Sequence, residues 1–169
     1  MAEQQEQLLS GSSEFPYHIS VGAVLLNEKD EVCVHHFGTH TLGGKTAKDF
    51  YILMRETPES DEAIIEALHR GLFEEFGATA SVIHYIGPLV CEVNYKHLKE
   101  KTTLYFLCKL LDQDENDRAK DDPESNSSIE WLGIDFLIEK MQKQGKETGL
   151  ADLDESKILQ RTKQLLPNL

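Results

Sequence analysis

The sequence has few cysteines, and their arrangement suggests neither a disulfide framework nor a zinc site. The three that occur, Cys33, Cys91 and Cys108, are odd in number and far apart. Zinc sites and redox pairs need cysteines at short, defined spacings, and structural disulfides belong mainly to oxidising compartments. We therefore expect three buried free thiols in a reducing compartment.

Long apolar runs are also missing. No stretch approaches the roughly 20 apolar residues that a membrane-spanning helix needs. Residues 1–15, MAEQQEQLLSGSSEF, have neither the basic start nor the continuous apolar core of a secretory leader. These absences predict a cytoplasmic protein with no membrane partner. We expect residues 1–15 to be a flexible N-terminal segment and residues 16–169 to be a single domain.

Basic residues are scarce. The chain has 17 Lys and Arg against 30 Asp and Glu, which gives a formal net charge of -13 at pH 7. Nonspecific nucleic-acid binding relies on basic side chains that neutralise phosphates, so we expect no nucleic-acid partner. Small phosphate-bearing molecules are not excluded, because a bound metal ion can reverse the local field. A magnesium-dependent site is therefore favoured over a basic anion pocket.

The order of β-forming runs, turns and amphipathic segments predicts a mixed sheet with helices packed on it, an α/β (α+β) fold. The first two strands should form a hairpin through a turn at 27–30. Seven acidic side chains make 112–128 an expected solvated loop. Strands are expected at 18–26, 31–37, 51–53, 81–93, 102–111 and 130–132, and helices at 62–76, 135–144 and 154–166.

A Gly-Gly-Lys-Thr segment at 43–46 superficially matches the end of a phosphate-binding loop. That motif needs an earlier glycine at a fixed offset and a following helix, and the sequence offers neither. We interpret 39–48 as a flexible surface loop. The neighbouring pair His35-His36 shows no metal-ligand spacing, and alternation along a strand would place its two side chains on opposite faces.

The stretch 51–78, YILMRETPESDEAIIEALHRGLFEEFGA, combines a short strand, a turn and an amphipathic helix that ends in glycine. Neighbouring carboxylates on such a helix can hold a hard divalent cation. A surface helix with charged pairs explains the same pattern without a metal. The charged side chains are Glu62, Glu66, Arg70, Glu74 and Glu75, and the apolar stripe is Ile65, Leu68, Leu72 and Phe76.

With these residues at these spacings, the stretch 51–78 resembles the Nudix hydrolase family. The family's box is Gly, five residues, Glu, seven residues, then Arg-Glu-apolar-any-Glu-Glu-any-Gly-apolar. The matching positions within 56–78 are Glu62, Arg70, Leu72, Glu74, Glu75, Gly77 and Ala78. The flanking strands agree over roughly residues 17–140. The resemblance implies the Nudix fold, a mixed β-sheet sandwiched between α-helices. It also implies a hydrolase that cleaves a pyrophosphate bond in a nucleoside diphosphate linked to another group.

The resemblance also implies roles for the matching residues. Glu74 and Glu75 would hold Mg2+ or Mn2+ and are the catalytic candidates inside the box. Glu62 and Arg70 would brace the preceding loop against the helix, and Gly77 would form a left-handed helix cap. Spacing predicts a further ion pair between Arg70 and Glu66, one turn before it.

Two positions depart from the box. Glu56 stands in place of its first glycine, and Gly71 stands in place of the glutamate after Arg70, which in the family binds metal or activates water. Glycine inside a helix costs about 1 kcal/mol relative to alanine. The departures leave a second interpretation open, a catalytically impaired Nudix module that binds a nucleotide or a protein partner.

An acid outside the box is expected to complete the site. The acidic loop offers Glu124 or Asp122, and the turn before the helix offers Glu56 or Glu59. Of these, Glu124 is our catalytic candidate.

A nucleotide-type small molecule is the expected ligand. Arg55 is a candidate for binding it, and so is Tyr95, because a tyrosine near this distance from the box stacks on a base in dinucleoside-polyphosphate hydrolases of the family. Family members often dimerise, so a homodimer is a further expectation.

Overall fold

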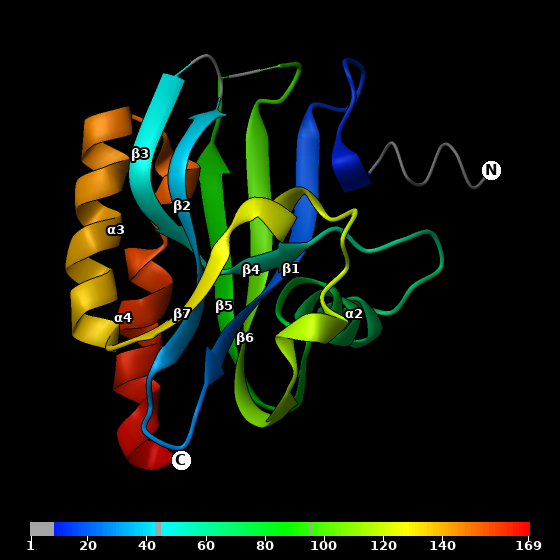
Figure 1. Cartoon of the computed structure of the whole chain (residues 1–169). Coiled ribbons are helices and arrows are strands. Elements are labelled where there is room, and N and C mark those ends of the chain that lie inside the picture. Colours follow the sequence, from blue (N-terminus) through cyan, green and yellow to red (C-terminus); the bar gives the residue numbers. More distant parts are fainter. Residues whose placement is uncertain (1–8, 43–44, 95) are drawn as a thin grey trace.

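The computed structural model describes residues 9–42, 45–94 and 96–169, which form a seven-stranded mixed sheet and three α-helices (Figure 1). The strands are β1 (Tyr17–Leu26), β2 (Val32–Leu42), β3 (Lys45–Ile52), β4 (Met54–Glu56), β5 (Ala78–Glu92), β6 (Glu100–Gln113) and β7 (Ser128–Leu132). The helices are α2 (Ile64–Phe76), α3 (Ile134–Thr148) and α4 (Ser156–Leu165). Short 3-10 turns are η1 (Glu115–Asp117), η2 (Pro123–Asn126), η3 (Ala151–Leu153) and η4 (Leu166–Asn168).

The sheet has the strand order β3-β2-β1-β6-β5, with β4 paired to β1 and β7 paired to β2. The β1–β6 pair is parallel along the whole of β1, from Tyr17 opposite Glu100 to Leu26 opposite Lys109. The other pairs are antiparallel. This arrangement confirms the predicted mixed sheet of the α/β (α+β) class.

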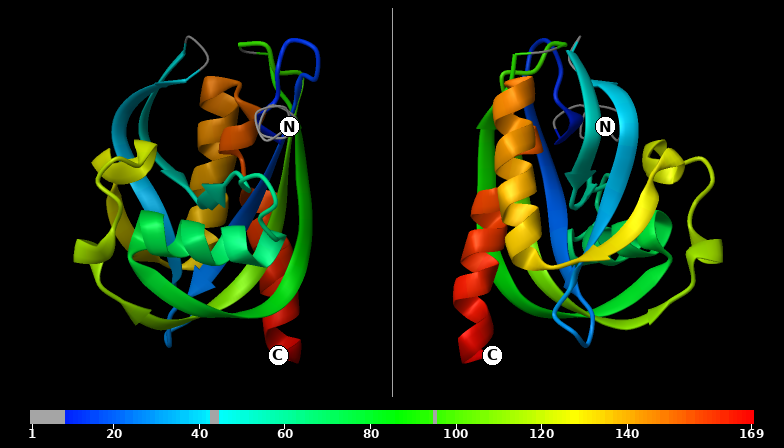
Figure 2. Two further views of the ribbon diagram at one scale, coloured as in Figure 1. Left: turned by 90° about the vertical axis from the view of Figure 1, so that its right-hand side faces the viewer. Right: turned by 60° about the vertical axis from the view of Figure 1, so that its left-hand side comes forward.

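Helices cover both faces of the sheet, α2 on one side and α3 with α4 on the other (Figure 2). Side chains along β1 alternate between these two layers, as the pleat requires. Val24 and Leu26 lie in the core beneath α3 and α4, whereas Ala23 and Leu25 lie in the core beneath α2. The predicted sandwich of a sheet between helices is therefore confirmed.

The expected hairpin of the first two strands is only partly correct. β1 and β2 pair at their closed end, with Leu26 opposite Val32. Beyond it they diverge, because β1 pairs with β6 and β4 while β2 pairs with β3 and β7.

Residues interpreted as a flexible loop at 39–48 belong largely to the sheet. β2 and β3 form a hairpin in which Thr41 lies opposite Thr46; residues 43–44 lie outside the described parts of the chain. The strand expected at 81–93 is part of a continuous β5, with an irregularity in its pairing between Tyr85 and Gly87. α3, expected to end at 144, continues through Gly145 to Thr148 and is capped by Gly149, which has the left-handed conformation (φ 66°).

Other expectations concern the cysteines and the termini. All three cysteines are buried and free, as predicted. Across the described ranges, no helix has the length and apolar character needed to cross a bilayer. Residues 1–8 lie outside those ranges, and Pro16 O accepts a hydrogen bond from Lys99 N at 2.8 Å. The division into residues 1–15 and 16–169 stays a prediction.

α2 begins and ends through local chemistry. Glu66 Oε2 accepts a hydrogen bond from Ala63 N at 3.1 Å, so Glu66 caps the N-terminus of the helix. The expected Glu66–Arg70 pair is therefore wrong, and Arg70 pairs with other glutamates. At the other end, Gly77 has φ 61°, and its N–H bonds Phe73 O at 2.8 Å. The left-handed cap predicted for Gly77 is confirmed.

Gly77→Ala is expected to lower the free energy of unfolding by about 2 kcal/mol or more, because a left-handed backbone disfavours any side chain. A Cβ atom there would also lie 1.9 Å from Asp114 O. Urea unfolding measures the loss. The control is Gly133→Ala, since Gly133 has φ -64° and an added Cβ would meet nothing within 4 Å. Equal midpoints for the two variants would contradict the prediction.

Candidate active site

Two adjoining cavities share Arg55, Lys101, Pro123 and Glu124 in their walls. The second, of about 190 Å3, has an aromatic wall that includes Phe37, Phe50 and His40. The first, of about 250 Å3, is mainly polar and is lined by His18, Ser20, Arg55, Glu56, Thr57, Glu75, Lys101, Asp122, Pro123 and Glu124. Segments far apart in the sequence therefore meet around one charged space.

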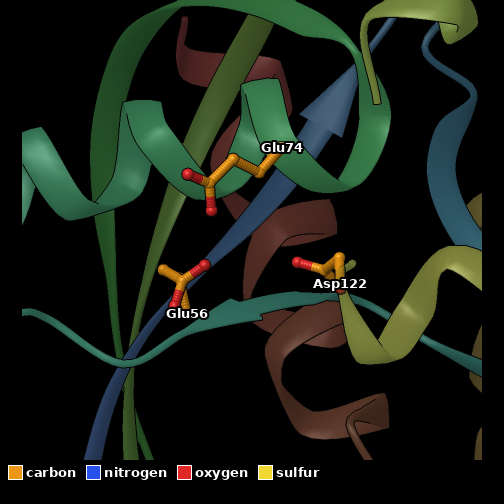
Figure 3. A group of neighbouring side chains, drawn as sticks. All are labelled: Glu56, Glu74 and Asp122. Carbon is orange, nitrogen blue, oxygen red and sulfur yellow. The ribbon is translucent and has the colours of Figure 1, made fainter. Parts of the chain in front are cut away.

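Three carboxylates from three elements converge beside the first cavity, and two of them, Glu56 and Asp122, line it. Glu56 ends β4, Glu74 lies near the end of α2, and Asp122 directly precedes η2. Their side chains point toward a common space (Figure 3), and one carboxylate oxygen of each lies within 4.8 Å of the other two. Carboxylate oxygens are the ligands that Mg2+ and Mn2+ prefer. The donor set therefore fits the divalent ion that the sequence implies.

The amphipathic pattern of α2 places its acidic side chains. The helix buries one face, which includes Ala67, Leu68, Leu72 and Phe76, against β1 and β4. Arg70 and Glu74 are one turn apart on another side of the helix, where Arg70 contacts both Glu74 and Glu56. Glu75 is the next residue along and points inward, with 2% of its surface exposed. The two consecutive glutamates of the box thus have different surroundings.

Arg70 connects the turn before α2 to the carboxylates on the helix. Its guanidinium donates two hydrogen bonds to Glu62, at 2.8 and 2.9 Å, and one to Thr57 O at 3.1 Å. Its Nη1 lies 3.2 Å from Glu56 Oε2 and 3.3 Å from Glu74 Oε2. The hydrogen bonds to Glu62 raise the pKa of Arg70. This geometry matches the bracing role expected of Glu62 and Arg70.

Glu56 and Gly71, the two departures from the box, are in direct contact. A Cβ atom added to Gly71 would lie 2.8 Å from Glu56 Cβ and 2.8 Å from Met54 Sδ. The glycine inside α2 is therefore required by the side chain at position 56. Burial raises the pKa of Glu56, and the nearby Arg70 opposes that shift.

Glu75 is bonded to a histidine in the interior. Its Oε2 lies 2.6 Å from Nε2 of His35, which is fully buried, and His35 Nδ1 lies 2.7 Å from Ser127 Oγ. Ser127 Oγ in turn donates to Glu124 O at 2.7 Å, so Nδ1 of His35 is the donor to Ser127. Burial raises the pKa of Glu75 and lowers that of His35 to about 3. A protonated Glu75 that donates to a neutral His35 satisfies all of these contacts.

The acidic loop of residues 112–128 exposes most of its acidic side chains, as expected, and its backbone is ordered around Arg118. The Arg118 side chain donates to Glu75 O at 2.7 Å, to Glu124 O at 3.1 Å and to Ser127 O at 3.2 Å. These bonds attach the loop to the end of α2. Asp122 Oδ1 accepts from Glu124 N at 2.9 Å, which starts η2. The loop is thereby fixed with Asp122 beside the carboxylates of β4 and α2.

Two cations line both cavities, and acids from the C-terminal segment hold them. Arg55 Nη1 donates to Asp152 O at 3.0 Å, and Arg55 Nε lies 3.7 Å from Glu155 Oε1. Lys101 Nζ lies 3.2 Å from Asp152 Oδ2. Nearby, burial and then Lys101 lower the pKa of His18 to about 4, so this histidine is neutral at pH 7. Positive charge is thus concentrated on Arg55 and Lys101 in a strongly acidic protein.

Four of the five candidate residues from the sequence lie at or beside the cavities. Arg55 and Glu124 line the cavities, and burial with Asp122 nearby raises the pKa of Glu124 to about 8. Glu74 joins the converging carboxylates. Glu75 lines the first cavity, although its carboxyl group bonds to His35. Tyr95 lies outside the described residues. These assignments of Glu74, Glu75, Glu124, Arg55 and Tyr95 stay predictions.

The sequence interpretation missed several contributors. His35 was recognised only as one of an alternating pair, and Lys101, Asp152 and Glu155 gave no signal. The buried contact of His35 with Glu75 joins residues 40 positions apart. Asp122 had been weighed beside Glu124, and the geometry favours Asp122 as the residue that joins Glu56 and Glu74.

Known proteins share this architecture. The NUDIX domain family matches residues 16–153, and no curated protein matches the chain. A MutT protein from Methanosarcina mazei Go1 has a TM-score of 0.62 at 19% identity, covering 88% of this chain and 94% of that chain. A NUDIX hydrolase from Nitrosomonas europaea has a TM-score of 0.61 at 16% identity, and the match covers 85% of this chain and 89% of that chain. A UDP-X diphosphatase has a TM-score of 0.57 at 16% identity, and the match covers 89% of this chain and 63% of that chain.

The family match across most of the chain shows that this protein belongs to the NUDIX family. Nudix hydrolases generally use a divalent metal ion and act on nucleotide-type substrates. At identities below 20%, the solved structures show the shared fold.

Proposed function

We propose that this protein is a metal-dependent hydrolase that cleaves a pyrophosphate bond in a nucleoside diphosphate linked to another group. The observation that carries the proposal is the convergence of Glu56, Glu74 and Asp122 within a Nudix fold. Their combined negative charge needs a cation, and the nearby Arg70 contacts only Glu56 and Glu74 among the three.

The proposal assigns roles to several charged side chains at this site. Glu74, Glu56 and Asp122 would hold Mg2+ or Mn2+, and the bound ion would supply screening of the diphosphate charge. Arg55 and Lys101 bind phosphate oxygens. These two cations line both cavities, and so they lie where a diphosphate would join two larger groups.

Glu75 and Glu124 complete the proposed catalytic set. Glu75 lines the same cavity and would reach the ion by exchanging its bond to His35 for a metal contact. Glu124 is the acid outside the box that assists the attacking water. Ser127 joins His35 to the main-chain carbonyl of Glu124, so the histidine that holds Glu75 also contacts the segment that carries Glu124.

The second cavity offers a place for the nucleoside. Its wall includes Phe37 and Phe50, whose rings stack with centroids 5.1 Å apart and an interplanar angle of 11°. Aromatic side chains favour contact with a planar base. A base in this cavity would place the attached diphosphate near Arg55 and Lys101, which the two cavities share.

The function is tested with nucleotide sugars, dinucleoside polyphosphates, ADP-ribose and nucleoside triphosphates, each with Mg2+ and with Mn2+. Chromatography of the products would show which bond breaks. Absence of turnover with either ion would contradict the hydrolase. Calorimetry that then showed metal-independent nucleotide binding would favour the alternative, a catalytically impaired module, which the missing acid at Gly71 first suggested.

Asp122→Asn is expected to lower kcat/KM by at least about tenfold, since a loss of about 1.4 kcal/mol at the transition state has that effect. The substitution keeps the size of the side chain and the acceptor for Glu124 N. Asp121→Asn is the matched control, because Asp121 is the exposed neighbour outside the converging group. Equal rates for both variants would contradict the role of Asp122.

A further inference from the structure

We propose that Glu56 is a metal-coordinating residue, and that it supplies the carboxylate which the family's box places directly after Arg70. Gly71 occupies that place in this chain and provides the space for the Glu56 side chain. This role rests on the proposed metal-dependent function. The two departures from the box are thus related: a glutamate on the strand, at position 56, replaces the glutamate that the box places on the helix, at position 71. We call this replacement the exchange.

β4 and α2 approach so closely here that only one of the two positions can carry a large side chain. A Cβ atom at Gly71 would lie 2.8 Å from Glu56 Cβ and 3.2 Å from Glu56 Cγ, and contacts below 3.0 Å essentially never occur between such atoms. Antiparallel pairing with β1 fixes Glu56 Cβ, since Glu56 lies opposite Val21. Met54 Sδ, also 2.8 Å away, belongs to a flexible side chain that can shift.

From the strand, the Glu56 carboxylate reaches the space beside Glu74. Its Oε1 accepts a hydrogen bond from Thr57 N at 2.9 Å, which orients the group. Its Oε2 lies 3.2 Å from Arg70 Nη1, the atom that also contacts Glu74 at 3.3 Å. One of its oxygens lies within 4.8 Å of an oxygen of Glu74 and of Asp122. Glu56 on β4 therefore supplies the carboxylate that is absent at Gly71 on α2.

Glu56→Gln tests the ligand role alone. The amide keeps the packing against Gly71 and an acceptor for Thr57 N, but it removes the negative charge. Binding of Mn2+ to the full chain, measured by the loss of the free-ion electron paramagnetic resonance signal, should weaken about tenfold or more, because carboxylate charge sets the affinity of such sites. The melting temperature without metal should stay within about 2 °C, a change below 1 kcal/mol. Glu59→Gln is the control, since Glu59 follows Glu56 by three residues, outside β4, and its side chain is 69% exposed.

The exchange is tested by restoring glutamate at position 71 and glycine at position 56, separately and together. Gly71→Glu alone should lower the melting temperature without metal by about 5 °C or more, because overpacking destabilises a core. Glu56→Gly alone should weaken Mn2+ binding about tenfold or more. In the double variant Glu56→Gly/Gly71→Glu, the side chain at 71 gains the space that Glu56 left. That variant should melt above Gly71→Glu and bind Mn2+ within about threefold of the wild type.

Two results would overturn the exchange. One is Mn2+ affinity in Glu56→Gln equal to that of the wild type and of Glu59→Gln. The other is a double variant that binds Mn2+ no better than Glu56→Gly. Failure of the proposed function is distinguishable, because a protein with no turnover on any substrate can still show the expected changes in Mn2+ binding and melting. Conversely, turnover unaffected by Glu56→Gln would overturn the role of Glu56 and leave the hydrolase standing.

Discussion

Glu75→Gln is expected to lower kcat/KM by on the order of 100-fold or more, equivalent to about 3 kcal/mol of lost transition-state stabilisation. Glu75 occupies a metal position of the Nudix box and lines the first cavity. Glutamine cannot supply the negative charge that a metal contact needs. Its amide still provides a donor for His35 Nε2, so the fold should be preserved. The measurements are initial rates with Mg2+ and urea unfolding of the same variant.

Glu66→Gln is the matched control, since it makes the same glutamate-to-glutamine change in the same helix. Glu66 is exposed and caps the start of α2 through Ala63 N, away from the cavity. Its rate should stay close to that of the wild type. If Glu75→Gln also retains full activity, the Glu75 carboxyl group serves only as the partner of His35. Glu56, Glu74 and Asp122 would then be the sufficient metal set.

The fold was predictable because its signals are periodic. Alternation along β1 and the apolar stripe on α2 each specify a buried face, and the register of Glu62, Arg70 and Gly77 identifies the box. The partner of β1 could not be predicted in the same way. Its parallel pairing with β6 joins residues about 80 positions apart, from Tyr17 to Glu100, and no local pattern marks that contact.

Composition predicted the exposure of most acidic side chains in the acidic loop, but it did not predict the order of the backbone there. Its low hydrophobicity is typical of a solvated segment. The order comes from one side chain, Arg118, which donates to three backbone carbonyls. Bonds to carbonyl oxygens are independent of the residue types that supply them, so the sequence carries no trace of these partners. The choice between Asp122 and Glu124 likewise depended on how η2 is fixed.

Gly71 and Glu56 were both recognised in the sequence as departures from the box, but the relation between them could not be predicted. Each appeared as a separate loss from the box. The contact between Gly71 and the Glu56 side chain relates the two substitutions, and it depends on how closely β4 approaches α2. Spacing along the chain gives no measure of that approach.

Glu155→Ala is expected to lower the free energy of unfolding by about 3–5 kcal/mol, the usual cost of removing one partner from a buried charged network. Glu155 is fully buried. Its carboxylate accepts hydrogen bonds from Leu53 N at 2.8 Å and from the Tyr105 hydroxyl, and it faces Arg55 Nε at 3.7 Å. Burial raises the pKa of Glu155, and Arg55 opposes that shift.

Urea unfolding of Glu155→Ala measures the loss, with Glu139→Ala as the control. Glu139 is exposed on α3, and its removal should change stability by less than about 0.5 kcal/mol. Because Glu155 also holds Arg55 at the wall shared by both cavities, any Glu155→Ala protein that folds should show a raised KM. A stability loss below about 1 kcal/mol would mean that water or a rearranged Arg55 replaces the carboxylate, because an unsatisfied buried group costs at least that much. Glu155 would then not be what fixes Arg55 in place.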